Sequence, residues 1–216
     1  MHIFDSLLTH QGIEDPEAGL TRRLKCRGSE AYAELIEKYE KPVFGFVYRL
    51  LDCRDDAPDV TQEVFVKVFR RIDDFRGDST LKTWIYRIAV HEASNRRRWF
   101  NRHCRSEVSI EASSEERGSA WEWLRDRREG PFERLQHVER LDLVEEALRD
   151  IDDRLRAAVV MRDLEGLSYN EIAAALEVSL GTVKSRILRG REALRTALQR
   201  HLSGTLGGVR LQTTTE

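Results

Sequence analysis

The residues whose types and spacing best suit a chemical task lie between positions 182 and 189, and the task is recognition of DNA. If this segment is helical, the spacing i, i+3, i+4, i+7 places four polar side chains on one face: Thr182, Ser185, Arg186 and Arg189. Their hydroxyl and guanidinium groups can hydrogen-bond to base edges in a major groove. Lys184 adds positive charge for phosphate groups alongside.

A helix-turn-helix would position these side chains. Ser168 and Glu171 have the spacing of a capping box, which predicts a short helix that begins after Ser168 and runs to Leu176. A tight turn at 177–179 then leads into a second helix from Leu180, with its apolar residues facing the first helix. The combination predicts a recognition helix whose N-terminal amides can meet a phosphate.

The turn departs from the usual pattern at Glu177. Many such turns carry Gly there, because a left-handed conformation costs a non-Gly residue about 1–2 kcal/mol. The alternative interpretation of the whole segment is a basic amphipathic helix in an ordinary helical hairpin.

A second concentration of positive charge lies in residues 82–105. The chain as a whole is nearly balanced, with 36 basic and 38 acidic residues, but in this segment only Glu92 opposes the basic side chains. Aromatic surfaces in a basic groove suit a separated nucleic-acid strand. Trp84 lies on an apolar stripe with Leu81 and Ile88 and is expected in the core, so Tyr86 is the exposed aromatic candidate.

The pattern of apolar residues predicts an all-α fold with two small helical domains joined by a flexible linker. Pro42 is expected to divide a helix at 31–40 from one at 43–51, Pro58 to mark the start of the next helix, and Asp78 or Ser79 to cap the helix after it. The expected organisation is a leader (1–24), a first domain (25–102), an acidic linker (103–132), a second domain (133–202) and a disordered tail (203–216).

The sequence offers little support for catalysis, metal binding or membrane insertion. It contains no recognised catalytic motif, so we expect a protein that is not an enzyme and uses no cofactor. Its 3 cysteines are widely spaced, which argues against disulfides and zinc and favours a reducing cytoplasm. Neither a signal peptide nor a long apolar segment is evident.

Four segments together resemble one protein family. The segments 59–65 (DVTQEVF), 75–79 (FRGDS) and 83–89 (TWIYRIA) resemble region two of sigma-70 family factors, and 181–186 (GTVKSR) resembles region four. With a short linker in place of region three, the chain is similar to the extracytoplasmic-function subgroup. The resemblance covers roughly residues 25–102 and 133–202, and it departs at Pro58 and in a longer, Trp-containing linker.

The resemblance implies a bacterial sigma factor that binds core RNA polymerase, recognises the −10 and −35 promoter elements and promotes melting. It implies contacts to the beta-prime clamp helices through Asp59, Gln62 and Glu63. The alternative interpretation is that these residues only cap the helix and stabilise its dipole. Contacts to the −35 element fall to Thr182, Lys184, Ser185, Arg186 and Arg189. Contacts to the −10 element, duplex or single-stranded, fall to Arg76, Ser79, Thr80, Tyr86, Arg87, His91, Asn95, Arg96, Arg97 and Arg98.

Further partners and one competing function follow from the same comparison. The resemblance implies the polymerase beta flap as a second docking site and allows for an anti-sigma factor, which no residue identifies. The acidic linker is either a solvated tether or a mimic of nucleic acid. The competing function is a helix-turn-helix regulator that acts on duplex DNA without core polymerase.

Overall fold

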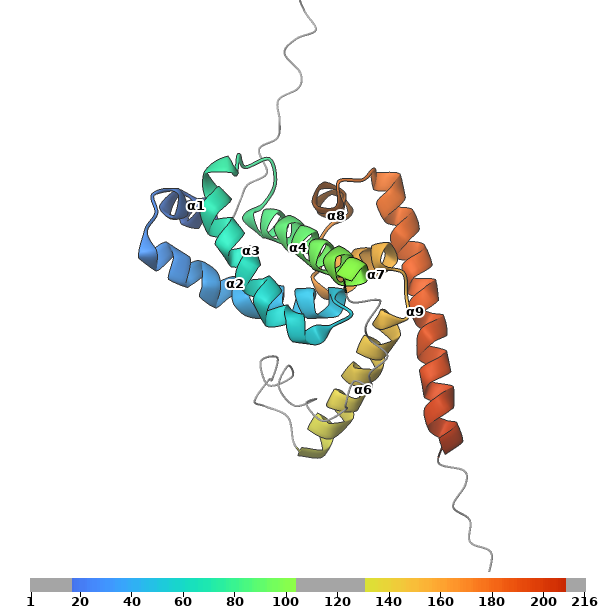
Figure 1. Ribbon diagram of the computed structural model, residues 1–216. Helices are drawn as coiled ribbons and strands as arrows, with labels where there is room; N and C mark the ends of the chain where they lie inside the picture. Colours follow the sequence, from blue (N-terminus) through green and yellow to red (C-terminus); the bar gives the residue numbers. More distant parts are fainter. Residues whose placement is uncertain (1–16, 104–130, 209–216) are drawn as a thin grey trace, which may run out of the picture.

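The computed structural model describes residues 17–103 and 131–208, and every regular element in these two ranges is helical (Figure 1). The prediction of an all-α protein is confirmed. Within the described residues, no helix combines the length and the apolar character needed to cross a lipid bilayer. The expected leader up to residue 16, the central part of the expected linker and the tail from residue 209 lie outside the described residues.

The first range, here called the N-terminal module (residues 17–103), is a bundle of four helices: α1 (Ala18–Lys25), α2 (Ser29–Leu50), α3 (Ala57–Arg71) and α4 (Leu81–His103). Helices α2, α3 and α4 pack on one another. Val43, Phe46, Val60, Val64 and Ile85 are fully buried between them. The helical periodicity of these apolar residues accounts for the bundle, because each helix buries one stripe.

Helix α2 runs without a break through Pro42, so the predicted division of this segment is wrong. Proline inside a helix loses one hydrogen bond and clashes with the preceding turn. Pro42 itself lies on the exposed side, while its neighbours Tyr39, Val43 and Phe46 lie on the buried side. Burial of that stripe compensates for the proline.

The predicted start is correct for α3 and wrong in its capping residue for α4. Pro58 lies in the first turn of α3, as predicted, where its missing N–H costs nothing. At α4 the expected caps Asp78 and Ser79 are wrong, because Thr80 has this role. The Thr83 backbone N–H donates to Thr80 Oγ1 at 3.1 Å.

The second range, here called the C-terminal module (residues 131–208), contains α6 (Pro131–Arg149), α7 (Asp153–Val159), a π-helical turn (Val160–Leu164), α8 (Tyr169–Leu176) and α9 (Leu180–Gly208). Helix α9 continues to Gly208, past the predicted start of the tail at residue 203. It crosses α7 closely at Gly190, where an added Cβ would lie 2.5 Å from Val159 Cγ2.

The two modules are packed against each other, which the sequence did not predict. Helix α8 contacts α4, and α6 and α7 contact α2; Figure 1 shows α8 beside α4. One continuous cluster of buried apolar side chains includes members of both modules. A chain expected to be two tethered bundles therefore forms a closed arrangement.

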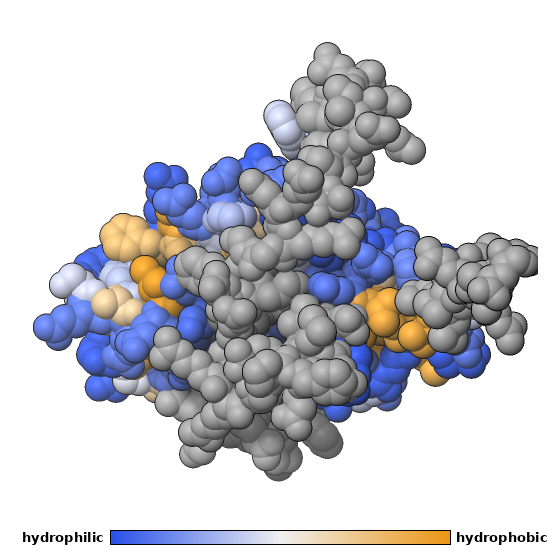
Figure 2. Space-filling model, turned by 90° about the horizontal axis from the view of Figure 1, so that it is seen from below, coloured by the Kyte–Doolittle hydropathy of each residue, from blue (hydrophilic) through white to orange (hydrophobic). Residues whose placement is uncertain are grey.

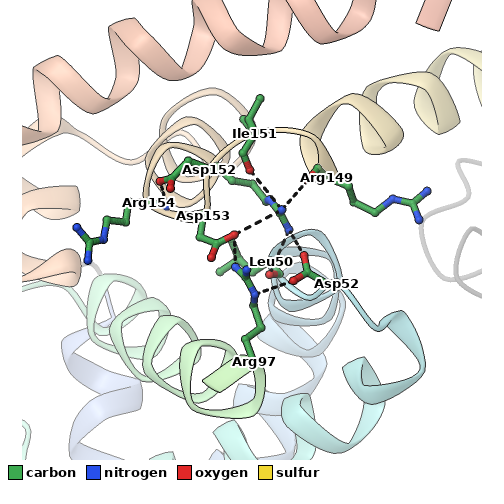
Figure 3. Close-up of polar contacts among 9 residues, drawn as sticks. Leu50, Asp52, Arg97, Arg149, Ile151, Asp152, Asp153 and Arg154 are labelled. Atoms are coloured by element: carbon green, nitrogen blue, oxygen red, sulfur yellow. Dashed lines mark hydrogen bonds and ion pairs between the residues drawn. The ribbon is translucent and has the colours of Figure 1, made fainter. Parts of the chain in front are cut away.

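A buried arginine links the two modules at the end of α2 (Figure 3). The Arg156 guanidinium is 2% exposed and donates to Asp52 Oδ1 at 3.0 Å and to the Leu50 carbonyl at 3.5 Å. Within its own module it donates to the carbonyls of Arg149, at 3.0 Å, and Ile151, at 3.4 Å. The guanidinium thus bridges backbone and carboxylate groups from both modules.

Candidate nucleic-acid interfaces

The capping box predicted for α8 is present in full. The Glu171 N–H donates to Ser168 Oγ at 3.3 Å, and the Ser168 N–H donates to Glu171 Oε2 at 2.8 Å. These two bonds satisfy amides that the first turn of a helix otherwise leaves without partners. They fix the start of the first helix of the helix-turn-helix.

The turn between α8 and α9 adopts the conformation that the sequence pattern anticipated. Glu177 is left-handed, with φ 54° and ψ 45°, and the Val178 N–H donates to the Ala173 carbonyl at 3.1 Å. One detail differs at the start of α9. The N–H of Thr182 donates to Ser179 Oγ at 3.2 Å, so this amide is already bonded.

The outward face of α9 carries the predicted duplex-reading residues together. Lys184, Ser185 and Arg189 are exposed, Thr182 and Arg186 are half-buried, and the alternate face with Val183 and Ile187 is buried. Hydroxyl, ammonium and guanidinium groups on one accessible helix face can bind base edges and phosphates of a duplex.

The predicted exposed aromatic of α4 is instead buried. Tyr86 has no exposed surface, and its ring packs edge-on against Phe46 with centroids 4.9 Å apart. Helix α4 is covered by the N-terminal module on one side and by α8 on the other, so its buried stripe is wider than the sequence pattern indicated. Trp84, expected in the core, is half-buried and lies 5.3 Å from the Phe75 ring.

The remaining candidates near α4 fall into different environments. Arg76, Arg87, His91, Asn95 and Arg98 are exposed, whereas Ser79 and Thr80 are half-buried. Arg98 donates to Asn95 Oδ1 at 2.6 Å, which orients the pair along the helix surface.

The other two arginines of the basic run are bound within the protein. Arg96 lies 3.8 Å from Asp56 and 3.7 Å from Asp59. Arg97 forms ion pairs with Asp52, at 2.9 Å, and with Asp153 of the C-terminal module. Of the three consecutive arginines, these two therefore face carboxylates in this arrangement.

Three carboxylates of the C-terminal module, here called the acidic trio (Glu165, Glu171, Glu177), lie against α4. Glu177 pairs with Arg87, Glu171 accepts from Thr83 Oγ1 at 3.0 Å, and Glu165 accepts from the Tyr86 hydroxyl.

The surroundings of the acidic trio alter the ionisation of its members and their partners. Burial raises the pKa of Glu165, and burial together with the Glu165 charge raises the pKa of Tyr86. Burial acts to raise the pKa of Glu171, but hydrogen bonds from Ser168, Thr83 and Thr80 outweigh it and lower that pKa. Glu171 is therefore held in its charged form.

The acidic residues predicted to face polymerase lie at the start of α3. Asp59, Gln62 and Glu63 are all exposed there. Sequence reasoning missed two apolar residues further along this helix, Val66 and Phe69, which are 39% and 47% exposed. The sequence does contain a signal for them, because both residues fall outside the i, i+4 stripe that is buried in α3. Exposed apolar side chains beside polar ones are typical of a protein interface.

The wider surface agrees with a polar protein that has local apolar areas. The face in Figure 2 is mainly hydrophilic, with separate apolar areas toward opposite ends. Among the described residues, the large apolar side chains that are exposed are Ile36, Val66, Phe69, Trp99, Leu164, Leu180, Leu188 and Leu202. The same residues include no cluster of His, Cys, Asp and Glu suited to a metal ion.

A helix-turn-helix with an accessible basic recognition face, joined to a second bundle with its own basic helix, defines a two-module DNA-binding protein. The chain matches sigma-70 region 2 over residues 35–102 and sigma-70 region 4 over residues 141–194. It is 37% identical over 182 residues to the ECF RNA polymerase sigma-E factor of Escherichia coli strain K12, covering 83% of this chain and 93% of the relative. It is 33% identical over 186 residues to the RNA polymerase sigma-H factor of Pseudomonas aeruginosa, covering 86% and 95%.

Solved structures share the fold. The sigma factor RpoE of Bartonella quintana, in complex with the anti-sigma factor NepR, superposes with a TM-score of 0.62 and 24% identity, covering 78% of this chain and 96% of that one. CnrH in complex with the cytosolic domain of CnrY gives 0.57 and 21%, covering 84% and 96%. The chain belongs to the sigma-70 family, in its extracytoplasmic-function subgroup, and is an RNA polymerase sigma factor. A helix-turn-helix regulator independent of polymerase is not favoured.

Proposed function

We propose that this sigma factor reads the −35 element with the outward face of α9. The observation that carries the proposal is the accessible set of polar and basic side chains there: Thr182, Lys184, Ser185, Arg186 and Arg189. Replacing Arg186 by alanine is expected to weaken promoter-duplex binding by about 1–3 kcal/mol if its guanidinium contacts a base edge. Equal loss on a scrambled duplex would reduce Arg186 to a phosphate contact.

The second part of the proposal assigns the −10 element to α4 and the loop before it. The residues are Arg76, Ser79, Thr80, Arg87, His91, Asn95, Arg96, Arg97 and Arg98; Tyr86 is left out because its ring is buried. Guanidinium and hydroxyl groups suit the phosphates and bases of a separated strand. Such contacts would promote melting by stabilising the open strand.

The third part assigns core polymerase to α3. Asp59, Gln62 and Glu63 would bind the beta-prime clamp helices, and we add Val66 and Phe69 as the apolar part of the same interface. The beta flap would contact the C-terminal module. In this proposal, residues 25–102 form one functional domain and residues 133–202 form the other.

Regulation and location complete the proposal. Since solved relatives of this fold are in complex with an anti-sigma factor, or with the cytosolic domain of another protein, we propose an anti-sigma factor as a partner here. The protein would act in the cytoplasm, at the nucleoid when polymerase-bound, as a specificity factor without catalytic activity of its own.

Run-off transcription tests the proposal. Core polymerase is mixed with the full chain and candidate promoter fragments, and a discrete transcript is expected only when the chain is present. Arg186→Ala should reduce that transcript. Arg195→Ala, on an exposed part of α9 nine residues further along, is the matched control and should leave it unchanged. Absence of any transcript and of co-purification with core polymerase would overturn the proposal.

A further inference from the structure

We propose that the closed arrangement is self-inhibited: the acidic trio of the C-terminal module covers the surface of α4 that would otherwise bind the −10 strand. The inference rests on the proposed function of α4. It adds an intramolecular competitor for that surface, and it names the competitor by residue: Glu165, Glu171 and Glu177.

Two members of the trio, Glu177 and Glu171, are bonded to groups on or next to α4 that we assign to the −10 strand. Glu177 pairs with Arg87 and lies 4.0 Å from His91 Nε2. Glu171 accepts from Thr80 Oγ1 at 3.4 Å as well as from Thr83. A single-stranded phosphate must therefore compete with these carboxylates for the same donors.

At Glu165 both side chain and backbone take part. Its carboxylate accepts from Tyr86, and its carbonyl accepts from Lys82 Nζ at 2.7 Å. Three carboxylates and a carbonyl thus present oxygen acceptors to α4. Guanidinium groups bind carboxylate and phosphate in similar geometry.

The conformation of Glu177 supports a role for its side chain. Glycine adopts a left-handed turn without steric cost, yet this chain carries a left-handed Glu at the turn. Its carboxylate is directed to Arg87, across the interface between modules. An arrangement that only needed the turn would gain nothing from this carboxylate.

Contacts behind the trio hold the modules closed without using residues on the outward side of α9. Besides the Arg156 bridge shown in Figure 3, buried Glu145 of α6 lies 2.9 Å from Arg54 and 3.6 Å from Arg49 of the N-terminal module. The recognition face, with Lys184, Ser185 and Arg189 exposed, stays open. The closed form therefore blocks single-strand binding while leaving duplex binding intact.

The test removes charge from the trio and keeps the fold. The variant Glu177→Gln, here called the trio variant, removes the carboxylate that pairs with Arg87 and leaves Glu171 in place, because the capping box of Glu171 holds α8. The matched control is Glu192→Gln, which removes the same charge from the same module at an exposed position that pairs with Arg195 instead of α4. A gain in affinity that came only from the change in net charge would appear in both variants.

The first readout is binding of the free, full-length chain to a labelled single strand. The probe is the nontemplate strand of a promoter that gives a run-off transcript. Because the apparent affinity scales with the open fraction, loss of the exposed ion pair between Glu177 and Arg87 should strengthen binding by up to about fivefold in the trio variant. The control variant should bind like the wild type, and a −35 duplex should bind all three proteins equally.

The second readout is small-angle X-ray scattering of the free chains. The wild type and the control should share one radius of gyration, and the trio variant should have a larger one. A wild type that already scatters as an extended chain, or equal single-strand affinity of all three proteins, would overturn the self-inhibition while the transcript still stands. Loss of the transcript itself would count against the proposed function instead.

Discussion

Replacing Arg156 by methionine removes the guanidinium that bridges the two modules while keeping a long apolar side chain. Two of its hydrogen bonds are short, each 3.0 Å, to Asp52 Oδ1 and to the Arg149 carbonyl. The other two, to the carbonyls of Leu50 and Ile151, are at 3.5 and 3.4 Å and contribute less. A hydrogen bond to a charged group contributes about 1.5–3 kcal/mol, so the two short bonds amount to about 3–6 kcal/mol.

Part of this loss is recovered, because methionine needs no desolvation of a charge. We expect the free energy of unfolding to fall by about 2–4 kcal/mol, since the carbonyls of Arg149 and Ile151 lose a donor. In urea, a slope of about 2 kcal/mol/M converts this to a midpoint lower by about 1–2 M.

The control is Asp52→Asn, read by circular dichroism in the same urea series. Asparagine keeps an Oδ1 that can accept from Arg156, and Asp153 still lies 3.6 Å from the guanidinium, so the cost should stay below about 1 kcal/mol. If Arg156→Met unfolds within about 0.5 kcal/mol of the wild type, the reasoning about a guanidinium bridge between modules is refuted.

Three further outcomes follow from local geometry. Gly190→Ala should lower stability by about 1–3 kcal/mol because its Cβ would meet Val159 at 2.5 Å. Gly181→Ala, whose Cβ would lie 4.0 Å from Ser179 Oγ in ordinary contact, should leave the melting temperature nearly unchanged. Ser168→Ala removes one half of the capping box and should cost about 1 kcal/mol by thermal unfolding; an unchanged melting temperature would contradict the assignment. Burial raises the pKa of Glu165 above 4.5, so its stabilising contribution is complete below pH 4.5 and is lost as pH rises through the raised pKa. Urea midpoints measured from pH 4.5 upward should therefore fall less steeply in Glu165→Gln than in the wild type, and identical slopes would contradict this.

Local signals were sufficient for the helix-turn-helix because neighbouring residues determine it. The capping box at Ser168 and Glu171 and the left-handed Glu177 depend on a few positions in sequence, and the structure has both. The outward face of α9 follows from helical periodicity alone. The family resemblance, which depends on such local segments, was confirmed for the same reason.

Contacts between distant segments could not be predicted in this way. Arg156 and Asp52 are separated by 104 positions, and no periodic pattern relates them. The apolar stripe of α4 predicts an exposed Tyr86, but its ring packs on Phe46 of α2 and its hydroxyl donates to Glu165, which is 79 positions away. At Pro42, burial of the apolar stripe of α2 outweighs the local tendency of proline to end a helix.

The shared core has a consequence for how the chain is held together. In addition to the peptide connection, one apolar cluster and several ion pairs hold residues 17–103 against residues 131–208. Two polypeptides that correspond to these ranges, made separately, should therefore assemble as a heterodimer. The peptide connection in the natural chain acts mainly by raising the effective concentration of one half near the other. A cut in that connection would turn closure from a first-order event into one that depends on protein concentration.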